Sequence, residues 1–289
     1  MRKQVTIEIT RPQYTFVSGI TFAQVDGWFG HVVRDLKLDV IYPEDRTRRY
    51  PCVVWICGGA WLSMDRSAHT AYLSQLAMQG FVVASVEYRT SNEVRFPGPL
   101  QDVKAAIRYL RAHADRFNLD PERIGTMGES AGGYLTAMTA LADDPAFDKG
   151  AYLEQSSRVQ AAVPWYPPTD FTAMQSARSN AASPESLLLG LDVGTHPLEA
   201  EAACPVHYVT KAAPPMLMIH GTADTTVPFA QSELLYEKLE KAGCDVSLIA
   251  IEGSEHAGLP FFQPELWDAI LAFFRDKLGA PAPRAEKQE

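Results

Sequence analysis

The sequence predicts an α/β fold with a mainly parallel central sheet, helices on both faces and a small inserted cap. Two observations favour this class. Short apolar runs alternate along the chain with longer stretches of helical periodicity, which is typical of strands that helices bury on both faces. The glycine-rich stretch at 128–133 also lies where one apolar run becomes a helix.

The composition is that of a globular enzyme. The 289 residues are 46% hydrophobic, enough to form one large core. A formal net charge of -9, without a cluster of Lys or Arg, argues against nucleic acid or an anionic membrane as a partner. Residues 1–10 begin basic and then alternate like a strand, so we expect no signal peptide there. No apolar run approaches membrane-spanning length.

The chain has four cysteines, and their spacing fits neither a CxxC pair nor a zinc site. They are Cys52, Cys57, Cys204 and Cys244. We expect reduced, buried thiols and a cytoplasmic protein.

The first half of the chain is expected to hold three strands and two helices. Alternating apolar residues predict a strand over 36–43, and continuous apolar runs predict buried strands over 51–56 and 81–86. A helix is expected over 68–78, and the apolar stripe within 100–117 predicts a strong amphipathic helix.

The same alternation continues in the second half. A buried strand over 123–128 and a helix over 130–141 flank the glycine-rich turn. The remaining predicted elements are strands at 159–165, 216–220 and 246–251 and helices at 228–242 and 264–277.

Residues 167–215 separate two consecutive predicted strands and are rich in Ala, Ser and Pro. The segment is too long for a single crossover helix, so it predicts a cap inserted over the strand ends. Residues 279–289 are small and polar, which predicts a disordered tail. The expected organisation is therefore one domain over 1–278 with the cap at about 167–215.

Ser130 is the candidate nucleophile. In the sharp turn between strand and helix, its backbone would be strained and its hydroxyl exposed beside the N-terminus of the new helix. Glycines at 128, 132 and 133 would allow neighbouring backbone to approach so tight a bend. Because such glycine-rich sequences also arise by chance, the alternative is an ordinary turn with a helix-capping serine.

A serine hydroxyl needs a base to take its proton and an acid to orient that base. Asp224 leaves the carboxyl end of the predicted strand 216–220, and His256 lies in the loop after the last predicted strand. Catalytic groups of parallel sheets gather at these strand ends. The sequence therefore predicts a triad of Ser130, Asp224 and His256, in that chain order.

Other residues compete for these two roles. Glu252, Asp170 and Asp192 are alternatives to Asp224, which could instead be a turn former before a helix. The remaining histidines are less well placed. His31 precedes the first predicted strand, His69 and His113 are expected on helix surfaces, and His196 and His207 lie in the expected cap. His220 is expected to be a structural hydrogen-bonding residue inside a strand.

Acyl transfer also needs backbone N–H donors for an oxyanion. The loop at 57–61 leaves a predicted strand and could aim its amides inward, and the N–H of Ala131 follows the nucleophile directly. Phosphate binding is the competing use of a Gly-Gly loop, but neither nucleotide-binding motif is present. A plain turn also stays open. No HExxH or clustered His/Cys set indicates a metal, and we expect no cofactor.

Several motifs together resemble one enzyme family, the hormone-sensitive-lipase-like carboxylesterases, feruloyl and acetyl esterases and kynurenine formamidases of the α/β-hydrolase superfamily. The resemblance covers roughly residues 34–278. The motifs are Cys57-Gly58-Gly59-Ala60-Trp61, Glu87-Tyr88-Arg89, the segment from Phe96-Pro97 to Asp102, Gly128 to Gly133, His220 to Pro228 and His256.

The resemblance implies roles for individual residues. Ser130, Asp224 and His256 match the family's triad, while Gly59, Ala60 and Ala131 match its oxyanion-hole donors. Tyr88, Arg89 and Asp102 match a structural hydrogen-bond and ion-pair network under the site. Relatives carry a histidine where this chain has Cys57; because the backbone and not that side chain makes the hole, we expect the oxyanion hole to form without it.

These observations predict a serine carboxylesterase for small soluble esters with short acyl or aryl groups. Trp61, Trp165 and Tyr166 are candidates for the pocket wall, although aromatic residues at such places are often core. The alternatives are an amide or formamide hydrolase, similar to kynurenine formamidases or exopeptidases, and a non-catalytic small-molecule receptor. The expected partner is a small ester, with no nucleic acid and no membrane, and the sequence leaves a homodimer open.

Overall fold

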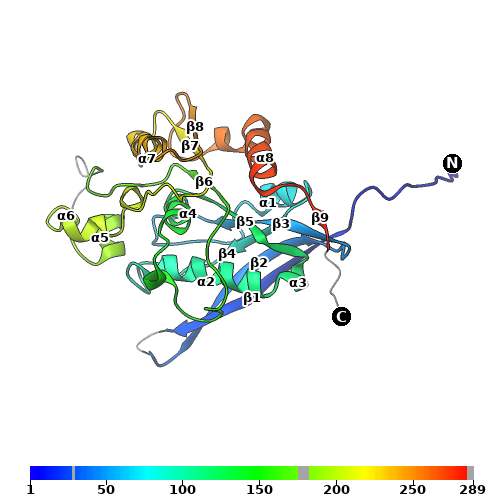
Figure 1. Cartoon of the computed structure of the whole chain (residues 1–289), viewed down its shortest axis with the longest axis horizontal. Helices are drawn as coiled ribbons and strands as arrows, with labels where there is room; N and C mark the ends of the chain where they lie inside the picture. Colours follow the sequence, from blue (N-terminus) through cyan, green and yellow to red (C-terminus); the bar gives the residue numbers. More distant parts are fainter. Residues whose placement is uncertain (28–29, 175–181, 285–289) are drawn as a thin grey trace.

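The computed structural model describes residues 1–27, 30–174 and 182–284 of the chain (Figure 1). Its main sheet has eight strands in the order β1-β2-β4-β3-β5-β6-β7-β8, and β9 pairs with the start of β3. The strands are β1 (Tyr14–Asp26), β2 (Val33–Pro43), β3 (Arg48–Ile56), β4 (Val82–Val86), β5 (Leu119–Glu129), β6 (Ala161–Trp165), β7 (Met216–Gly221), β8 (Val246–Ile251) and β9 (Ala282–Pro283).

The predicted mainly parallel sheet is confirmed. Strands β4, β3, β5, β6, β7 and β8 pair in parallel, whereas β1 and β2 add antiparallel pairs at one edge and the short β9 pairs antiparallel with the start of β3. All parallel strands therefore end at the same edge of the sheet, where their loops meet.

Helices cover both faces of the sheet (Figure 1). The helices are α1 (Thr70–Ala77), α2 (Gly98–Ala112), α3 (Ala114–Phe117), α4 (Ala131–Leu141), α5 (Pro184–Leu189), α6 (Pro197–Glu201), α7 (Ala230–Lys241) and α8 (Pro264–Leu278), with 3₁₀ turns η2 (Pro145–Phe147), η3 (Pro205–His207) and η4 (Leu259–Phe262). The buried residues of α2, α4 and α7 pack in one core cluster, and those of α1 and α8 pack in another.

Strand β3 shows how the sheet divides the core. Cys52, Val54 and Ile56 face the α2–α4–α7 cluster, whereas Val53 and Trp55 face the α1–α8 cluster. All five are fully buried, because a parallel strand with helices on both sides has no face in water. This is why the strand appears in the sequence as a continuous apolar run.

The N-terminal region differs from the prediction. Residues 1–10 form no strand, and the unpredicted β1 follows them and pairs with β2. Strand β1 was not evident because its pairing shifts register near Gly19, where the backbone has φ 73° and the N–H donates to Asp39 Oδ1 at 2.7 Å. Such irregularities break the two-residue periodicity that identifies a half-buried strand.

Two other predictions need correction. The single helix expected over 100–117 is broken at His113, whose ring stacks on Tyr109 with ring centroids 4.0 Å apart, so α3 is a separate turn. The tail expected to be disordered from 279 contains β9, in which Ala282 pairs with Arg49. The part of that prediction at 285–289 lies outside the described residues.

The segment between β6 and β7 contains α5, α6 and η3 and lies at one end of the molecule in Figure 1. It is called the β6–β7 segment below (residues 166–215). Its helices have five and six residues, so it supplies short elements and turns rather than a second sheet. Residues 175–181 within it lie outside the described part.

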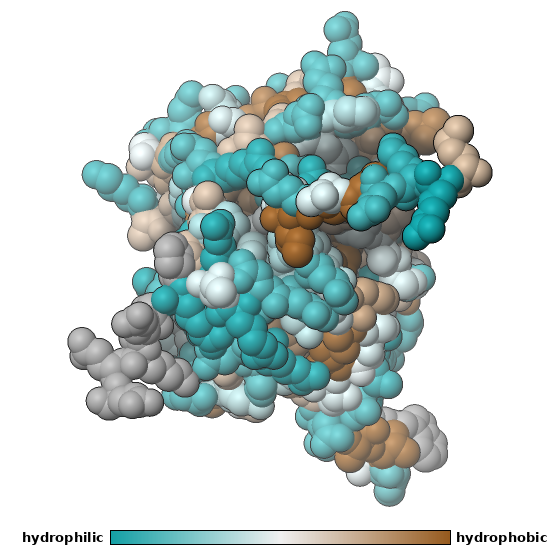
Figure 2. Space-filling model, turned by 90° about the vertical axis from the view of Figure 1, so that its right-hand side faces the viewer, coloured by the Kyte–Doolittle hydropathy of each residue, from teal (hydrophilic) through white to brown (hydrophobic). Residues whose placement is uncertain are grey.

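The molecular surface is mostly hydrophilic on the face drawn in Figure 2, where apolar residues form small separate groups. Over the described residues, no helix is both long and apolar enough to span a membrane.

The described cysteines are unpaired. Cys52, Cys57 and Cys204 are buried as expected, but Cys244 is half-exposed.

Candidate active site

Ser130 stands in the turn between β5 and α4. Its backbone has φ 52° and ψ −119°, a conformation that non-glycine residues rarely adopt, and its N–H donates to Trp165 O at 2.9 Å. Glycine is required around it: a Cβ on Gly132 would lie 2.0 Å from Ile56 O, and one on Gly128 would lie 2.6 Å from the same oxygen. The close approach of β3 and α4 thus fixes the strained turn that presents the hydroxyl.

The structure brings Ser130, His256 and Asp224 together in one hydrogen-bonded chain. His256 Nε2 lies 3.0 Å from Ser130 Oγ, and His256 Nδ1 lies 2.6 Å from Asp224 Oδ2. The serine and histidine are 126 residues apart in the chain. A hydroxyl, an imidazole and a carboxylate in this order can pass a proton away from the serine.

Asp224 is the most firmly held member of this chain. Its Oδ1 accepts hydrogen bonds from the N–H groups of Thr226 and Val227 at 2.8 and 2.9 Å, and its Oδ2 also lies 3.2 Å from His220 Nε2. Burial of the carboxyl works to raise its pKa, but hydrogen bonds from His220, His256 and Val227 outweigh burial and lower the pKa of Asp224. The carboxylate is therefore ionised at neutral pH.

His220 is buried and hydrogen-bonded, as the sequence indicated. Its Nδ1 lies 2.7 Å from Ser232 Oγ, and its Nε2 lies 2.9 Å from Val227 O. Two of the alternatives to Asp224 make other hydrogen bonds: Asp170 accepts from Thr172 N, and Asp192 accepts from Gly194 N. The third, Glu252, is exposed.

The loop after β3, residues 57–61, is the predicted oxyanion loop, and it turns through three residues with positive φ. Gly59, Ala60 and Trp61 have φ values of 125°, 55° and 57°, and a Cβ on Gly59 would lie 2.1 Å from Ser63 O. Among the described residues, the N–H groups of Gly59, Ala60 and Ala131 have no hydrogen-bond acceptor. Ala131 is the first residue of α4, where N–H groups are free to bind an anion.

Cys57 is held by its backbone and by its burial. Tyr88 Oη donates to Cys57 O at 2.9 Å, and Cys57 Sγ lies 3.8 Å from Glu129 Oε1. Burial raises the pKa of the Cys57 thiol to about 11. A thiol of this pKa is almost entirely protonated at neutral pH and therefore a poor nucleophile.

Glu129, the residue before Ser130, makes hydrogen bonds to side chains from two other segments of the chain. Its Oε1 lies 3.0 Å from His69 Nε2, and its Oε2 accepts from Tyr166 Oη at 2.7 Å. Burial works to raise its pKa, but hydrogen bonds from His69, Tyr166 and the Gly58 N–H outweigh burial and lower it. This ionised carboxylate braces the loop that a histidine in place of Cys57 would otherwise hold.

Two residues of this brace were not predicted from sequence. His69, expected on a helix surface, is half-buried just before α1, and its ring stacks on Phe262 at a centroid distance of 4.8 Å. Glu129 was not predicted as a site residue because the second position of the G-x-S-x-G motif accepts any residue. One signal was available: a loop lacking its usual histidine needs another donor, and His69 is a histidine shortly after that loop.

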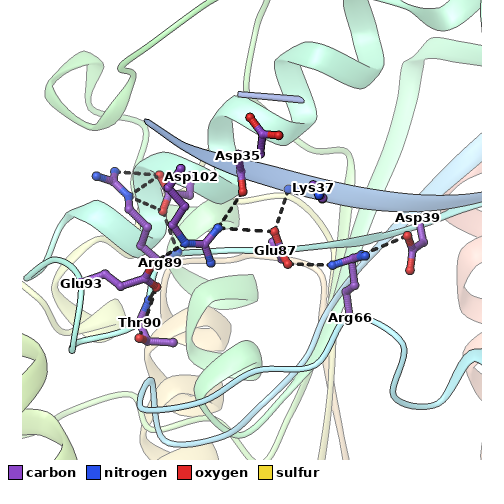
Figure 3. Close-up of polar contacts among 10 residues, drawn as sticks. Asp35, Lys37, Asp39, Arg66, Glu87, Arg89, Thr90, Glu93 and Asp102 are labelled. Atoms are coloured by element: carbon purple, nitrogen blue, oxygen red, sulfur yellow. Dashed lines mark hydrogen bonds and ion pairs between the residues drawn. The ribbon is translucent and has the colours of Figure 1, made fainter. Parts of the chain in front are cut away.

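A network of charged residues connects β2, the segment after β4 and α2 (Figure 3). The guanidinium of Arg89 binds the carboxylate of Asp102 with contacts of 2.8 to 3.2 Å. Glu87 accepts from Lys37 N at 2.8 Å and from Arg66 Nη1 at 2.7 Å. These contacts hold the segment after β4 in place, which is the structural role that the resemblance implied for Arg89 and Asp102.

A cavity of about 130 Å³ opens at Ser130. Trp61 lines it beside Ala60 and Ala131, so this predicted pocket residue is at the site. Trp165 and Tyr166 are not among its lining residues. Trp165 packs in the core against Trp55. Tyr166 packs against the ring of His256, with the two ring centroids 4.6 Å apart.

Residues of the β6–β7 segment form the other wall of the cavity. They include Phe171, Met174, Pro184 and Val193, which are apolar, and Glu185. Sequence reasoning placed a cap here but identified none of these side chains. Within the described ranges, no group of three or more His, Cys, Asp or Glu residues is placed to hold a metal ion.

This chain is similar to a known family and to curated proteins. A family model described as BD-FAE matches residues 38–239. The probable carboxylic ester hydrolase LipM of Mycobacterium tuberculosis is 34% identical over 227 residues, which are 76% of this chain and 50% of that protein. The chain thus spans about half the length of this curated relative.

Solved structures agree in fold. A truncated carbohydrate esterase from gut microbiota superposes with a TM-score of 0.81 and 32% identity, over 91% of this chain and 96% of that one. Esterase 2 of Thermogutta terrifontis, solved in a form phosphorylated by paraoxon, has a TM-score of 0.72 and 27% identity, over 98% of this chain and 100% of that one.

Proposed function

The chain belongs to the BD-FAE family of the α/β-hydrolase superfamily, and we propose on that basis that it is a serine carboxylesterase for small esters. One observation carries the proposal: Ser130 Oγ, His256 and Asp224 form a continuous hydrogen-bonded chain at the mouth of a cavity. Its relatives and structural neighbours include proteins named as esterases.

In the proposed acylation step, Ser130 Oγ attacks the ester carbonyl carbon while His256 Nε2 takes the hydroxyl proton. The carbonyl π electrons move to oxygen, and the resulting oxyanion accepts hydrogen bonds from the N–H groups of Ala131 and of Gly59 or Ala60. When the tetrahedral intermediate collapses, His256 gives its proton to the alkoxide, which leaves as the alcohol.

In the proposed deacylation step, a water molecule gives a proton to His256 and attacks the acyl carbon. Collapse of the second intermediate returns that proton to Ser130 Oγ and releases the carboxylic acid. Asp224 stays ionised throughout and stabilises the transient imidazolium. Its lowered pKa suits it to that role.

We propose that the β6–β7 segment acts as the cap of a single hydrolase domain and limits the substrate. A cavity of about 130 Å³ has room for a short acyl group beside Trp61 and Phe171. We also propose a cytoplasmic location, in line with the free thiols of the described cysteines.

The decisive experiment combines hydrolysis of p-nitrophenyl acetate with covalent labelling by a fluorophosphonate or paraoxon. We expect the wild-type protein to hydrolyse the ester and to carry the phosphorus adduct on Ser130. The Ser130→Ala variant should do neither while melting at the wild-type temperature. An adduct on any other residue, or a Ser130→Ala variant with wild-type turnover, would refute the proposed mechanism.

A further inference from the structure

The described residues that line the proposed reaction cavity carry a net negative charge. Glu185, in the first turn of α5, is the one charged residue among the described residues that line it. The lining contains no Lys or Arg in those ranges. Of the described lining residues, a substrate that enters the cavity therefore meets one carboxylate and no cationic side chain.

The carboxylate of Glu185 is available to a ligand. The side chain is half-buried, and it makes no hydrogen bond or ion pair with the residues that the structure describes. Arg95 approaches the same short helix, but its guanidinium donates to Leu187 O nearer the other end. Arg95 is also absent from the cavity lining.

Two further carboxylates near Ser130 add to the negative charge of Glu185. Asp224 and Glu129 are both ionised, and each has its hydrogen bonds satisfied by neighbouring donors. Neither is compensated by a nearby Lys or Arg in the hydrogen bonds and ion pairs of the described residues. Within the described residues, the carboxylates at the site are therefore held by histidines and neutral donors rather than by Lys or Arg.

We propose that Glu185 determines the charge of the substrate: the site accepts esters that are neutral or that carry an ammonium or hydroxyl donor, and it rejects esters that carry a carboxylate. This inference rests on the proposed esterase function. The physical reason is Coulombic: a cavity of about 130 Å³ is small on the scale of the Debye length of about 10 Å at 0.1 M salt, so the charge of Glu185 is felt throughout it.

An alternative role for Glu185 is to stabilise helix α5. An acidic residue in the first turn of a helix is favourable to the helix itself. Glu199 is likewise an acidic residue in the first turn of α6, is exposed and is absent from the described lining of the cavity. A Glu199→Gln variant is therefore the matched control for the loss of a first-turn charge.

The test compares three phenyl acetates that carry a para carboxylate, a para methyl ester or a para trimethylammoniomethyl group. For each protein the measured quantity is the kcat/KM ratio of the cationic to the anionic ester. Comparing ratios between variants cancels the different intrinsic reactivities of the substrates. We expect Glu185→Gln to lower the ratio by about tenfold and Glu185→Lys to lower it further, with smaller differences in 0.5 M NaCl.

The Glu199→Gln variant should keep the wild-type ratio, which separates charge selection from helix stability. A thermal melt of each variant checks its fold, and Glu185→Gln, which keeps the side-chain size, provides the test if Glu185→Lys does not fold. A ratio unchanged within twofold in Glu185→Gln, with the neutral ester still hydrolysed, would overturn the inference alone. Failure of the wild type to hydrolyse all three esters would instead overturn the proposed function and the inference with it.

Discussion

His69 Nε2 lies 3.0 Å from Glu129 Oε1, and this contact joins the start of α1 to the residue before Ser130. Because Glu129 Oε1 also lies 3.8 Å from Cys57 Sγ, the same carboxylate connects His69 with the predicted oxyanion loop. Family resemblance places a histidine at position 57 in relatives, whereas this chain has a cysteine there. His69 supplies the imidazole from a different part of the chain.

We expect His69→Ala to lower kcat by about 10- to 100-fold with little change in KM, because a misplaced oxyanion donor affects the transition state more than the bound substrate. Steady-state kinetics with p-nitrophenyl acetate measures the split. The double variant Cys57→His/His69→Ala should recover part of the loss, since position 57 already lies within 3.8 Å of Glu129 Oε1. A His69→Ala enzyme with wild-type kcat would show that the contact is only structural.

Ser130→Ala and His256→Ala should each lower kcat by about 10⁴-fold or more, and Asp224→Asn somewhat less, because the triad acts as a unit. The measurement is turnover of p-nitrophenyl acetate by proteins whose circular dichroism and melting temperature match the wild type. His207→Ala, an exposed histidine of the β6–β7 segment, is the control and should keep full activity. A His256→Ala enzyme with a tenth of wild-type turnover would require a different base.

Cys57→Ala should retain activity within about tenfold, because the buried thiol is protonated at neutral pH and the loop is held by Tyr88 and Glu129. Mass spectrometry after iodoacetamide treatment at pH 7.5 should find Cys57 unmodified in the folded protein. Its modification rate should rise with pH toward a thiol pKa of about 11. Rapid alkylation at pH 7.5 would contradict a buried, protonated thiol.

The protein should lose stability at alkaline pH. Burial raises the thiol pKa of Cys57 to about 11 and of both Cys52 and Cys204 to about 12, each from an ordinary value of 9.0. Between those values the unfolded chain has lost thiol protons that the folded chain keeps, so the free energy of unfolding falls as pH rises. Each thiol contributes about 1.4 kcal/mol per pH unit in that window.

Urea titrations at pH 7.5, 9.5 and 10.5 measure this loss. A Cys204→Ala variant starts from a lower stability, but its free energy of unfolding should decline less steeply with pH than that of the wild type. Equal slopes for the two proteins would show that Cys204 does not contribute.

Acetyl and butyryl esters should exceed esters of ten or more carbons by at least tenfold in kcat/KM, because the cavity of about 130 Å³ leaves long chains little apolar surface to bury. Trp61→Ala should move the optimum to longer acyl chains by removing a wall that packs on Tyr134 and Phe171. The same change should cost about 3–5 kcal/mol of stability. A series of p-nitrophenyl esters measures the optimum, and rates that rise steadily to C12 would contradict a small pocket.

The sequence by itself determined the sheet strands β2 to β8, the helices that cover them and the chain order of Ser130, Asp224 and His256. These features are local: a buried parallel strand is a continuous apolar run, and a strained turn needs glycine where backbones meet. Strand β1 was lost because its register shifts interrupt the periodicity, and β9 because its pairing with β3 depends on residues far away in the chain.

Only the tertiary structure decided what surrounds the triad. His69 meets Glu129 across 60 residues, Tyr166 turns toward Glu129 and His256 rather than into the cavity, and Glu185 reaches the cavity from the β6–β7 segment. Each of these contacts joins parts of the chain that no periodicity or motif relates. Their positions follow from how the loops at the carboxyl edge of the sheet pack together, which is a property of the folded chain as a whole.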